Sequence, residues 1–289
     1  MLVPQILKRD ILERWHSSKV AGHLGVTAVL RLLKQRYYWP GMESDLEKYV
    51  RECEHCNRQK PNHRNNKNPQ RTILATRPME IWAMDIIGPL PVTKKANKYI
   101  LSMCDVFTKW PEVIALPDQT AKSVAKAIVD KIISTHGVPQ KILSDHGTNF
   151  ESEMIHQLCD MLHIKKIRTS AYHPQTNGQC EKQNGTLCDI LASMVNEEGN
   201  DWDEWIDLAL SVARGRPHAT SGVSPAAMLF GREISGWPDV TIPDPQAESP
   251  YKSDQAYLET LKRKLNQVHR RGREAMQETA LKKSNAMAE

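Results

Sequence analysis

Apolar residues recur every three or four positions through the first fifty residues, which is the spacing of a buried helix face. The pattern predicts three short helices: over 5–15, after an N-cap at Thr27, and from about 43 to the CEHC motif at 53–56. The segment YYWPGM separates the last two. The apolar faces are formed by Ile6 or Leu7, Ile11, Leu12, Trp15, Val29, Leu30, Leu33, Leu46, Tyr49 and Val50. A module this small buries too few residues for a stable hydrophobic core. A further interaction must therefore hold the helices together.

Two histidines and two cysteines in this region have the chemistry to do so. His16, His23, Cys53 and Cys56 supply two imidazoles and two thiolates, the tetrahedral set of a structural zinc site. A single CxxC is a weak signal, and the alternative is surface thiols with incidental histidines. The two spaced histidines in a helical module of this size strengthen the zinc interpretation. His55, between the cysteines, is not expected to turn to the same metal.

From residue 82 onward, short apolar runs alternate with helical patterns. Strands are predicted over 82–88, 99–106, 113–116, 141–144 and 164–168, and helices over 120–136 and 152–162. A further helix presents one apolar face formed by Leu187, Ile190, Leu191, Met194 and Val195. Three consecutive strands followed by alternating helices and strands predict an α/β fold, a mixed sheet covered by helices.

Three carboxylates occupy notable positions in this pattern. Asp85 lies inside a strand-like run that Pro89 ends, and Asp145 closes another apolar run. Glu181 begins a helix after the loop SAYHPQTNG, 35 residues beyond Asp145. Brought together, three acids would repel one another unless Mg²⁺ or Mn²⁺ were bound. The alternative is solvated surface charge, but an unpaired charge at Asp85 would cost several kcal/mol.

These acids, their order and the 35-residue gap resemble the DDE triad of retroviral and retrotransposon integrases, and the wording is closest to the Ty3/Gypsy branch. The N-terminal module resembles the HHCC domain that precedes this core, including GHLG and YYWPGM. The resemblance covers about residues 2–234. It implies a five-stranded RNase H-like core preceded by a small zinc-stapled three-helix domain and followed by a helical tail.

The resemblance also implies an activity. Asp85, Asp145 and Glu181 would hold two Mg²⁺ or Mn²⁺ ions, and the enzyme would process the 3′ ends of element DNA and join them to target DNA. Such enzymes act as homo-oligomers, dimers or tetramers. The expected location is the nucleus. If the chain is cut from a polyprotein, a cytoplasmic particle is expected as well.

Four further residues fall where members of this family touch the DNA end: Tyr172, Gln175, Lys182 and Asn184. The alternative for each is a solvated loop or helix residue. Asp105, near the end of the second predicted strand, could be mistaken for a triad member, but its DVFTKWPEV setting is the turn between the second and third strands in such integrases.

Length and composition indicate the number of domains and the kind of protein. A chain of 289 residues suits two or three domains, here 1–57 (zinc-binding), 58–77 (basic linker), 78–235 (core) and 236–289 (linker and helical tail). The net charge of +5 permits a polyanionic partner without demanding one. The chain shows no run of about 18 apolar residues and no signal peptide, so a soluble intracellular protein without a membrane partner is expected. Four other cysteines are expected to be reduced: Cys104, Cys159, Cys180 and Cys188.

Three segments leave alternatives open. The linker stretch 58–71 has five basic residues and no acid, so it either tracks DNA phosphates or is merely solvated. In 213–234 only HATSGVSP and FGRE clearly match related elements, at positions that are structural in the family. The tail from Asp254 carries Leu258, Leu261, Leu265 and Val268 at helical spacing, so it packs on a partner helix or lies along DNA. No SH3-like or chromodomain-like segment is recognised after it.

Two other functions compete with the integrase interpretation. The first is a catalytically inactive, host-adopted DNA-binding or scaffold protein derived from an integrase, and the intact set of three acids argues against it. The second is a nuclease of the RNase H group, for which the HHCC module and the 35-residue gap are unexpected.

Overall fold

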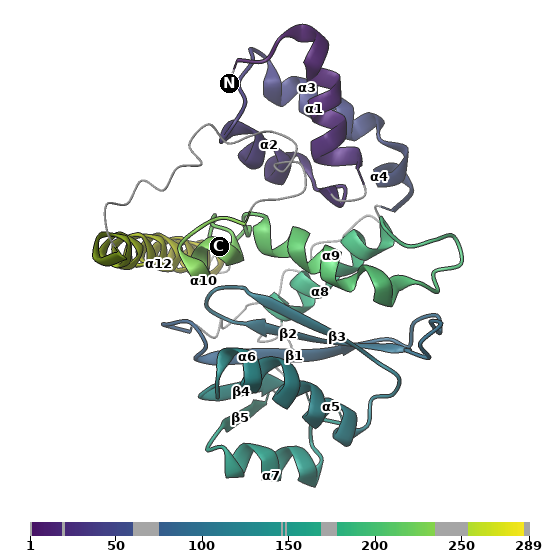
Figure 1. Cartoon of the computed structure of the whole chain (residues 1–289), viewed down its shortest axis with the longest axis vertical. Helices are drawn as coiled ribbons and strands as arrows, with labels where there is room; N and C mark the ends of the chain where they lie inside the picture. Colours follow the sequence, from purple (N-terminus) through teal and green to yellow (C-terminus); the bar gives the residue numbers. More distant parts are fainter. Residues whose placement is uncertain are drawn as a thin grey trace.

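The computed structural model describes residues 2–18, 21–59, 75–145, 147, 149–168, 178–234 and 254–285, and its side chains except those of 57–59, 178–182, 254 and 282–285. A small helical N-terminal region lies above one face of an α/β core, and a long C-terminal helix lies beside the core (Figure 1).

The N-terminal helices follow the predicted pattern with two differences. A continuous helical stretch is formed by η1 (Gln5–Leu7), α1 (Lys8–Leu12) and η2 (Glu13–Ser17), followed by α2 (Val26–Lys34) and α3 (Met42–Glu52). The predicted N-cap at Thr27 is wrong: Gly25 has the extended backbone of a cap, and Thr27 lies inside α2. The short helix α4 (Glu54–Gln59) was not predicted, because six residues are too few to show a periodicity.

The core contains the predicted mixed five-stranded sheet. Its strands are β1 (Ile81–Ile87), β2 (Tyr99–Asp105), β3 (Pro111–Leu116), β4 (Lys141–Ser144) and β5 (Lys165–Arg168), in the order β3-β2-β1-β4-β5. The first three strands pair antiparallel, whereas β4 pairs parallel to β1 and β5 parallel to β4. Parallel neighbours require crossover connections, which here are helical.

Helices cover both faces of the sheet (Figure 1). On one face lie α5 (Ala121–Ala127), η4 (Ile128–Ile133) and α6 (Ser134–His136), which form one continuous stretch, together with α7 (Glu153–Met161). Thr120 and Ser152 cap α5 and α7 by accepting backbone N–H bonds. On the opposite face lie α8 (Gly178–Ala192) and α9 (Trp202–Gly215).

Side-chain alternation along β1 assigns Asp85 to one of these faces. Trp82 and Met84 belong to the core beneath α5 and α7, whereas Ile87 packs on the side of α8 and α9. Successive strand residues point to opposite faces, so Asp85 faces the same side as Ile87. The carboxylate therefore lies on the face that α8 covers.

The N-terminal region packs directly on α8 and α9. Its apolar residues share one continuous cluster with Leu187, Ile190 and Ile206. Gly22 lies at this contact with a φ of +63°, and a Cβ there would approach Ile190 and Val212 to 3.2 Å. A side chain at position 22 would therefore disturb both the turn before His23 and the contact with the core.

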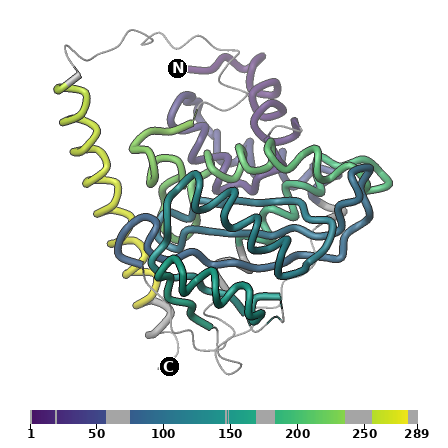
Figure 2. The backbone as a smooth tube through the Cα atoms, turned by 60° about the horizontal axis from the view of Figure 1, so that its bottom comes forward, coloured from purple at the N-terminus to yellow at the C-terminus, as the bar shows by residue number. Residues whose placement is uncertain are grey.

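The C-terminal part consists of α10 (Pro225–Phe230) and the 32-residue α12 (Asp254–Asn285), which packs against α10. Figure 2 shows α12 along one side of the molecule. Across the described ranges, no helix is both long enough and apolar enough to cross a membrane.

Candidate functional site

The four predicted zinc ligands come from four neighbouring elements and meet at one point. His16 lies on η2, His23 in the turn before α2, Cys53 directly after α3, and Cys56 on α4. All four ligand atoms lie within 4.8 Å of one another. The unpredicted helix α4 thus has a clear role, because it turns Cys56 back towards the two histidines.

The separations within this cluster fit a tetrahedral zinc ion. Cys53 Sγ lies 3.3 Å from His23 Nδ1, and Cys56 Sγ lies 3.5 Å from His16 Nε2 and 3.8 Å from His23 Nδ1. Zn–S and Zn–N bonds of about 2.3 and 2.0 Å would place N and S ligands about 3.5 Å apart in a tetrahedron. The donor set and its spacing therefore fit zinc, with all four positions filled by protein.

The surroundings of the histidines favour the form that binds metal. His16 Nδ1 lies 3.0 Å from the carbonyl oxygen of Leu24, and a proton donated there leaves Nε2 free to ligate. Burial and the neighbouring His55 and His16 rings lower the pKa of His23 to about 4. His23 is therefore neutral at physiological pH, as a zinc ligand must be.

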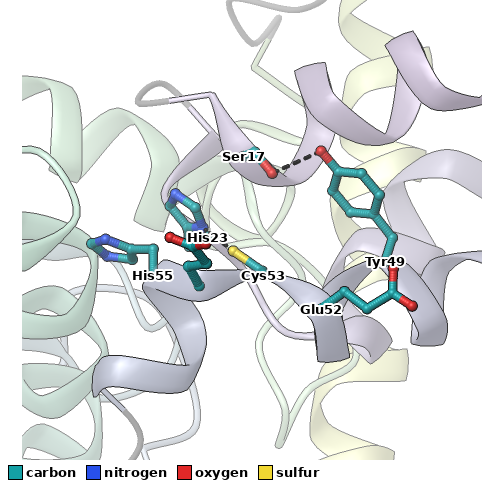
Figure 3. A pocket seen from close by; sticks show the side chains of 7 residues that line it. Ser17, His23, Tyr49, Glu52, Cys53 and His55 are labelled. Carbon is teal, nitrogen blue, oxygen red and sulfur yellow. Dashed lines mark hydrogen bonds between the residues drawn. The ribbon is translucent and has the colours of Figure 1, made fainter.

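His55 does not join the four ligands. Its ring stacks on that of His23, with centroids 4.3 Å apart and planes 28° from parallel. Figure 3 shows the two rings beside Cys53, with the hydrogen-bonded pair of Ser17 and Tyr49 nearby. His55 covers the site rather than completing it.

The pairing of β1 with β4 concerns two of the predicted catalytic acids, Asp85 and Asp145. Trp82 and Ala83 pair with Ile142 and Leu143 in the parallel β1–β4 ladder. The paired positions end there, and the same register continued for two more residues would bring Asp85 opposite Asp145, which directly follows β4, across the usual strand spacing of about 4.8 Å. Asp145 is exposed, and its Oδ1 accepts a hydrogen bond from Gly147 N at 3.0 Å.

Asn184 of α8 contacts the first of these acids. Its Nδ2 donates to Asp85 Oδ2 at 2.8 Å, while Asp85 Oδ1 accepts from Ile86 N at 2.9 Å. Asn184 is 6% exposed, and its Oδ1 has no hydrogen-bond partner within the described part of the chain. This amide fixes the carboxylate of Asp85 and holds α8 against β1.

The neighbouring Gln183 makes a second contact between α8 and the sheet. Its Oε1 accepts from Cys104 Sγ at 2.7 Å, and its Nε2 donates to the carbonyl of Lys109 at 3.0 Å. Burial raises the pKa of the Cys104 thiol to about 12, so it keeps its proton and acts as the donor. Adjacent residues of α8 thereby bind β1 and the β2–β3 turn.

The third acid, Glu181, lies on α8 one helical turn before Asn184. The side chains of Glu181 and Lys182 are outside the described part of the structure, as are residues Tyr172 and Gln175 altogether. Their assigned roles stay predictions. The DNA contact predicted for Asn184 also stays a prediction, and the structure adds its bond to Asp85, which the sequence interpretation missed.

The environment of Asp105 indicates a role in the structure of the β2–β3 turn. It is fully buried, and its carboxylate accepts bonds from Thr108 N at 2.8 Å, Thr108 Oγ1 at 2.6 Å and Met79 N at 3.0 Å. Burial raises its pKa against the effect of these bonds. The carboxylate organises the turn between β2 and β3, in agreement with its exclusion from the triad.

Comparison with known protein families identifies both domains. Residues 3–62 match the integrase zinc binding domain, and residues 75–174 match the integrase core domain. The chain belongs to the integrase family. The core match includes Asp85 and Asp145 and ends before Glu181, so the third acid of this integrase rests on its spacing and its place on α8.

The related proteins come from retroelements and from vertebrates. The chain is 30% identical to the retrovirus-related Pol polyprotein from transposon 412 of Drosophila melanogaster over 91% of its own length and 22% of that protein. It is 31% identical to the Gag-Pol polyprotein of avian reticuloendotheliosis virus over 80% and 20% of the two chains. It is 28% identical to the human Gypsy retrotransposon integrase-like protein 1 over 75% and 41%. The integrase thus spans about a fifth to two fifths of these relatives.

Solved structures with related folds include retroviral integrases. The catalytic core domain of BIV integrase aligns with 52% of this chain and 93% of its own, at 25% identity and a TM-score of 0.41. The simian T-cell lymphotropic virus intasome in complex with PP2A regulatory subunit B56 gamma aligns with 82% and 80% of the two chains, at 16% identity and a TM-score of 0.49.

Proposed function

We propose that this integrase processes the 3′ ends of element DNA and transfers them into target DNA. The observation that supports the proposal is the parallel pairing of β1, which contains Asp85, with β4, which Asp145 directly follows, under a helix whose Asn184 bonds Asp85. Carboxylates concentrated in this way provide hard oxygen ligands for divalent metal ions.

Each acid has a distinct part in holding the metal ions. Asp85 and Asp145 would be shared ligands, and Glu181 would complete the set from α8. Mg²⁺ or Mn²⁺ bound there would neutralise charge on the reacting phosphate and on the attacking and leaving oxygens. Asn184 keeps Asp85 in one orientation, which spares the site a reorganisation during the reaction.

The two reactions need the same arrangement. In 3′ processing, the oxygen of a water molecule bonds to phosphorus as the bond to the leaving 3′-oxygen breaks. In strand transfer, the freed 3′-hydroxyl attacks a target phosphate, and the target 3′-oxygen leaves. Neither step requires a covalent bond to the protein, because the bound metal ions would activate the attacking oxygen.

The remaining parts of the proposal concern assembly. Zinc at the four ligands would fold the N-terminal helices, which in turn pack on α8. Two DNA ends must be joined together, so a homo-oligomer is proposed, with the nucleus as the place of action. Mg²⁺ or Mn²⁺ in the core and Zn²⁺ in the N-terminal region are the proposed ions.

A DNA cleavage assay tests the proposal. The chain is incubated with duplexes that end in candidate element sequences, and with a branched substrate that permits the reverse of joining. The proposal expects metal-dependent release of short 3′ fragments and resolution of the branch. A chain that binds DNA yet does neither would be the inactive scaffold, and one that cuts RNA–DNA hybrids instead would be the RNase H-type nuclease.

Gln183→Met should lower this activity. Methionine has a similar length but neither accepts well from Cys104 nor donates to Lys109, so the start of α8 loses one of its two contacts with the sheet. A net loss of about 1.4 kcal/mol, typical of hydrogen bonds, would slow cleavage about tenfold. The measurement is the cleavage rate at saturating Mg²⁺, together with the Mg²⁺ concentration for half-maximal rate.

Gln157→Met provides the matched control. Gln157 is on α7, and its bond to Glu153 is exposed. Equal rates for Gln183→Met and Gln157→Met would show that the contact with Cys104 does not position the site.

A further inference from the structure

The positive charge of this chain is concentrated in one part of α12. Residues 260–273 contain six lysines and arginines and no acid. The rest of the chain holds 33 Lys and Arg against 34 Asp and Glu, so the net charge of +5 depends on this segment. The other strongly basic stretch, 58–71, lies almost wholly outside the described residues.

One side of this helix is anchored to the core. Leu261 and Leu265 lie beside Gly231, and His269 Nε2 lies 2.7 Å from the carbonyl oxygen of Met228. Gly272 permits the closest approach, because a Cβ there would come within 2.8 Å of the Met228 side chain. Met276, 6% exposed, continues the same side.

These anchors occur every three or four residues, so between Leu261 and Met276 the apolar side of α12 is covered by its own core, whereas Leu258 is 52% exposed. The sequence left open whether that side packs on a partner helix. The structure shows that the helix packs on α10 and the neighbouring core instead. What α12 leaves available is its outward face.

The outward face carries the basic groups. At 100° per residue, Arg263 and Arg270 point away from the anchored side, Lys264 and Arg271 lie to one side of them, and Lys262 and Arg273 lie at the edge of the anchored side. All six side chains are exposed: Lys262, Arg263, Lys264, Arg270, Arg271 and Arg273. Arg270 lies 3.9 Å from Glu274, and Arg273 donates to the carbonyl of Thr76 at 3.4 Å and lies over the Phe107 ring. An exposed ion pair of that length adds little, so Arg270 can exchange it for another anion.

We propose that this basic face, residues 262–273 of α12, binds the sugar-phosphate backbone of duplex DNA. The proposal rests on the proposed function, which supplies DNA as the polyanion. The face extends about 17 Å along the helix, enough to reach several phosphates. Exposed lysines and arginines spread along one helix suit contacts to phosphate rather than to base edges, so the proposed binding is independent of sequence.

The test compares two triple variants of the full chain. The first is Lys262→Gln, Arg263→Gln and Arg270→Gln together. The control is Lys122→Gln, Lys126→Gln and Lys131→Gln, which removes three exposed charges from the helical stretch α5–η4 on the other side of the sheet. Affinity for a random-sequence DNA duplex is measured by fluorescence anisotropy over a range of salt concentrations. The buffer contains neither EDTA, so that the protein keeps its zinc, nor Mg²⁺, so that the DNA is not cleaved.

The α12 variant should bind at least tenfold more weakly at low salt than the unchanged chain. Its slope of log K against log salt should fall by about 3, since each lost phosphate contact removes about 0.9. The control should keep both values. A conservative variant, Lys262→Arg, Arg263→Lys and Arg270→Lys, should bind like the unchanged chain, which separates charge from damage to the helix.

Three results would overturn the proposal: unchanged binding by the α12 variant, an equal loss in the control, or a loss seen with duplex RNA or anionic vesicles but not with DNA. Binding is measured without cleavage, so failure of the proposed activity is distinguishable. A chain that binds DNA through α12 and cuts nothing would refute the activity alone.

Discussion

Asp85→Asn, Asp145→Asn and Glu181→Gln are each expected to abolish metal-dependent cleavage and joining of DNA. Each change replaces a charged oxygen ligand by a neutral amide, so divalent ions bind poorly at the position where charge develops. A loss on the order of a thousandfold corresponds to about 4 kcal/mol of transition-state stabilisation. The rate is measured on the branched substrate at saturating Mg²⁺ and again with Mn²⁺.

Stability separates this effect from misfolding. Without metal, an Asn at position 85 can still accept the bond from Asn184, and the loss of charge relieves repulsion with Asp145. The unfolding temperature of the metal-free core should therefore hold or rise. Asp160→Asn, an exposed acid on α7, is the matched control and should retain full activity. Near-normal turnover by any of the three variants would remove that residue from the proposed site.

Loss of zinc is expected to unfold the N-terminal helices. Cys56→Ser removes a ligand that lies within 3.8 Å of both histidines, and a domain of this size takes most of its stability from the metal. Circular dichroism should show a loss of helix, and elemental analysis a loss of zinc. The shared apolar cluster adds a second effect: once Ile190 and Val212 lose their cover, the core should melt at a lower temperature although it remains folded.

His55→Gln is the control for the zinc experiment. It changes the ring that stacks on His23 without removing one of the four ligands. Zinc content should stay the same. If His55→Gln lost as much zinc as Cys56→Ser, or if chelation left the helical signal unchanged, the assignment of the four ligands would be wrong.

Periodicity and residue chemistry predicted a large part of this structure. Strand 141–144 has the predicted bounds, because apolar residues end abruptly at Asp145. The grouping of His16, His23, Cys53 and Cys56 followed from a chemical need, since a small helical module must be held together by something other than its core. Both features leave a local signal in the sequence.

Contacts between distant segments left no such signal. Asn184 and Asp85 are 99 positions apart, and Gln183 and Cys104 are 79 apart. Nothing in the spacing of polar residues along α8 distinguishes an amide that bonds a carboxylate across the sheet from one that faces solvent. The helical spacing of Asn184, three residues after Glu181, was the one available hint, because such residues share a helix face.

For the C-terminal helix α12, the sequence predicted an apolar face but not its partner. Leu261 and Leu265 indicated an apolar helix face, but hydrophobic spacing does not state what covers that face. The contact depends on Gly231 and Gly272, which allow close approach, and although Gly231 belongs to the FGRE motif, nothing in that motif indicates a contact with the tail.

The parallel pairing of β1 with β4 also determines when the proposed catalytic centre can first exist. The antiparallel strands β1, β2 and β3 are consecutive and can pair as soon as they leave the ribosome. Asp145 can approach Asp85 only after the helical crossover has formed and β4 has paired with β1. This pairing joins segments that are far apart in the sequence. A chain that stops at β3 therefore lacks Asp145 and cannot form the proposed metal site.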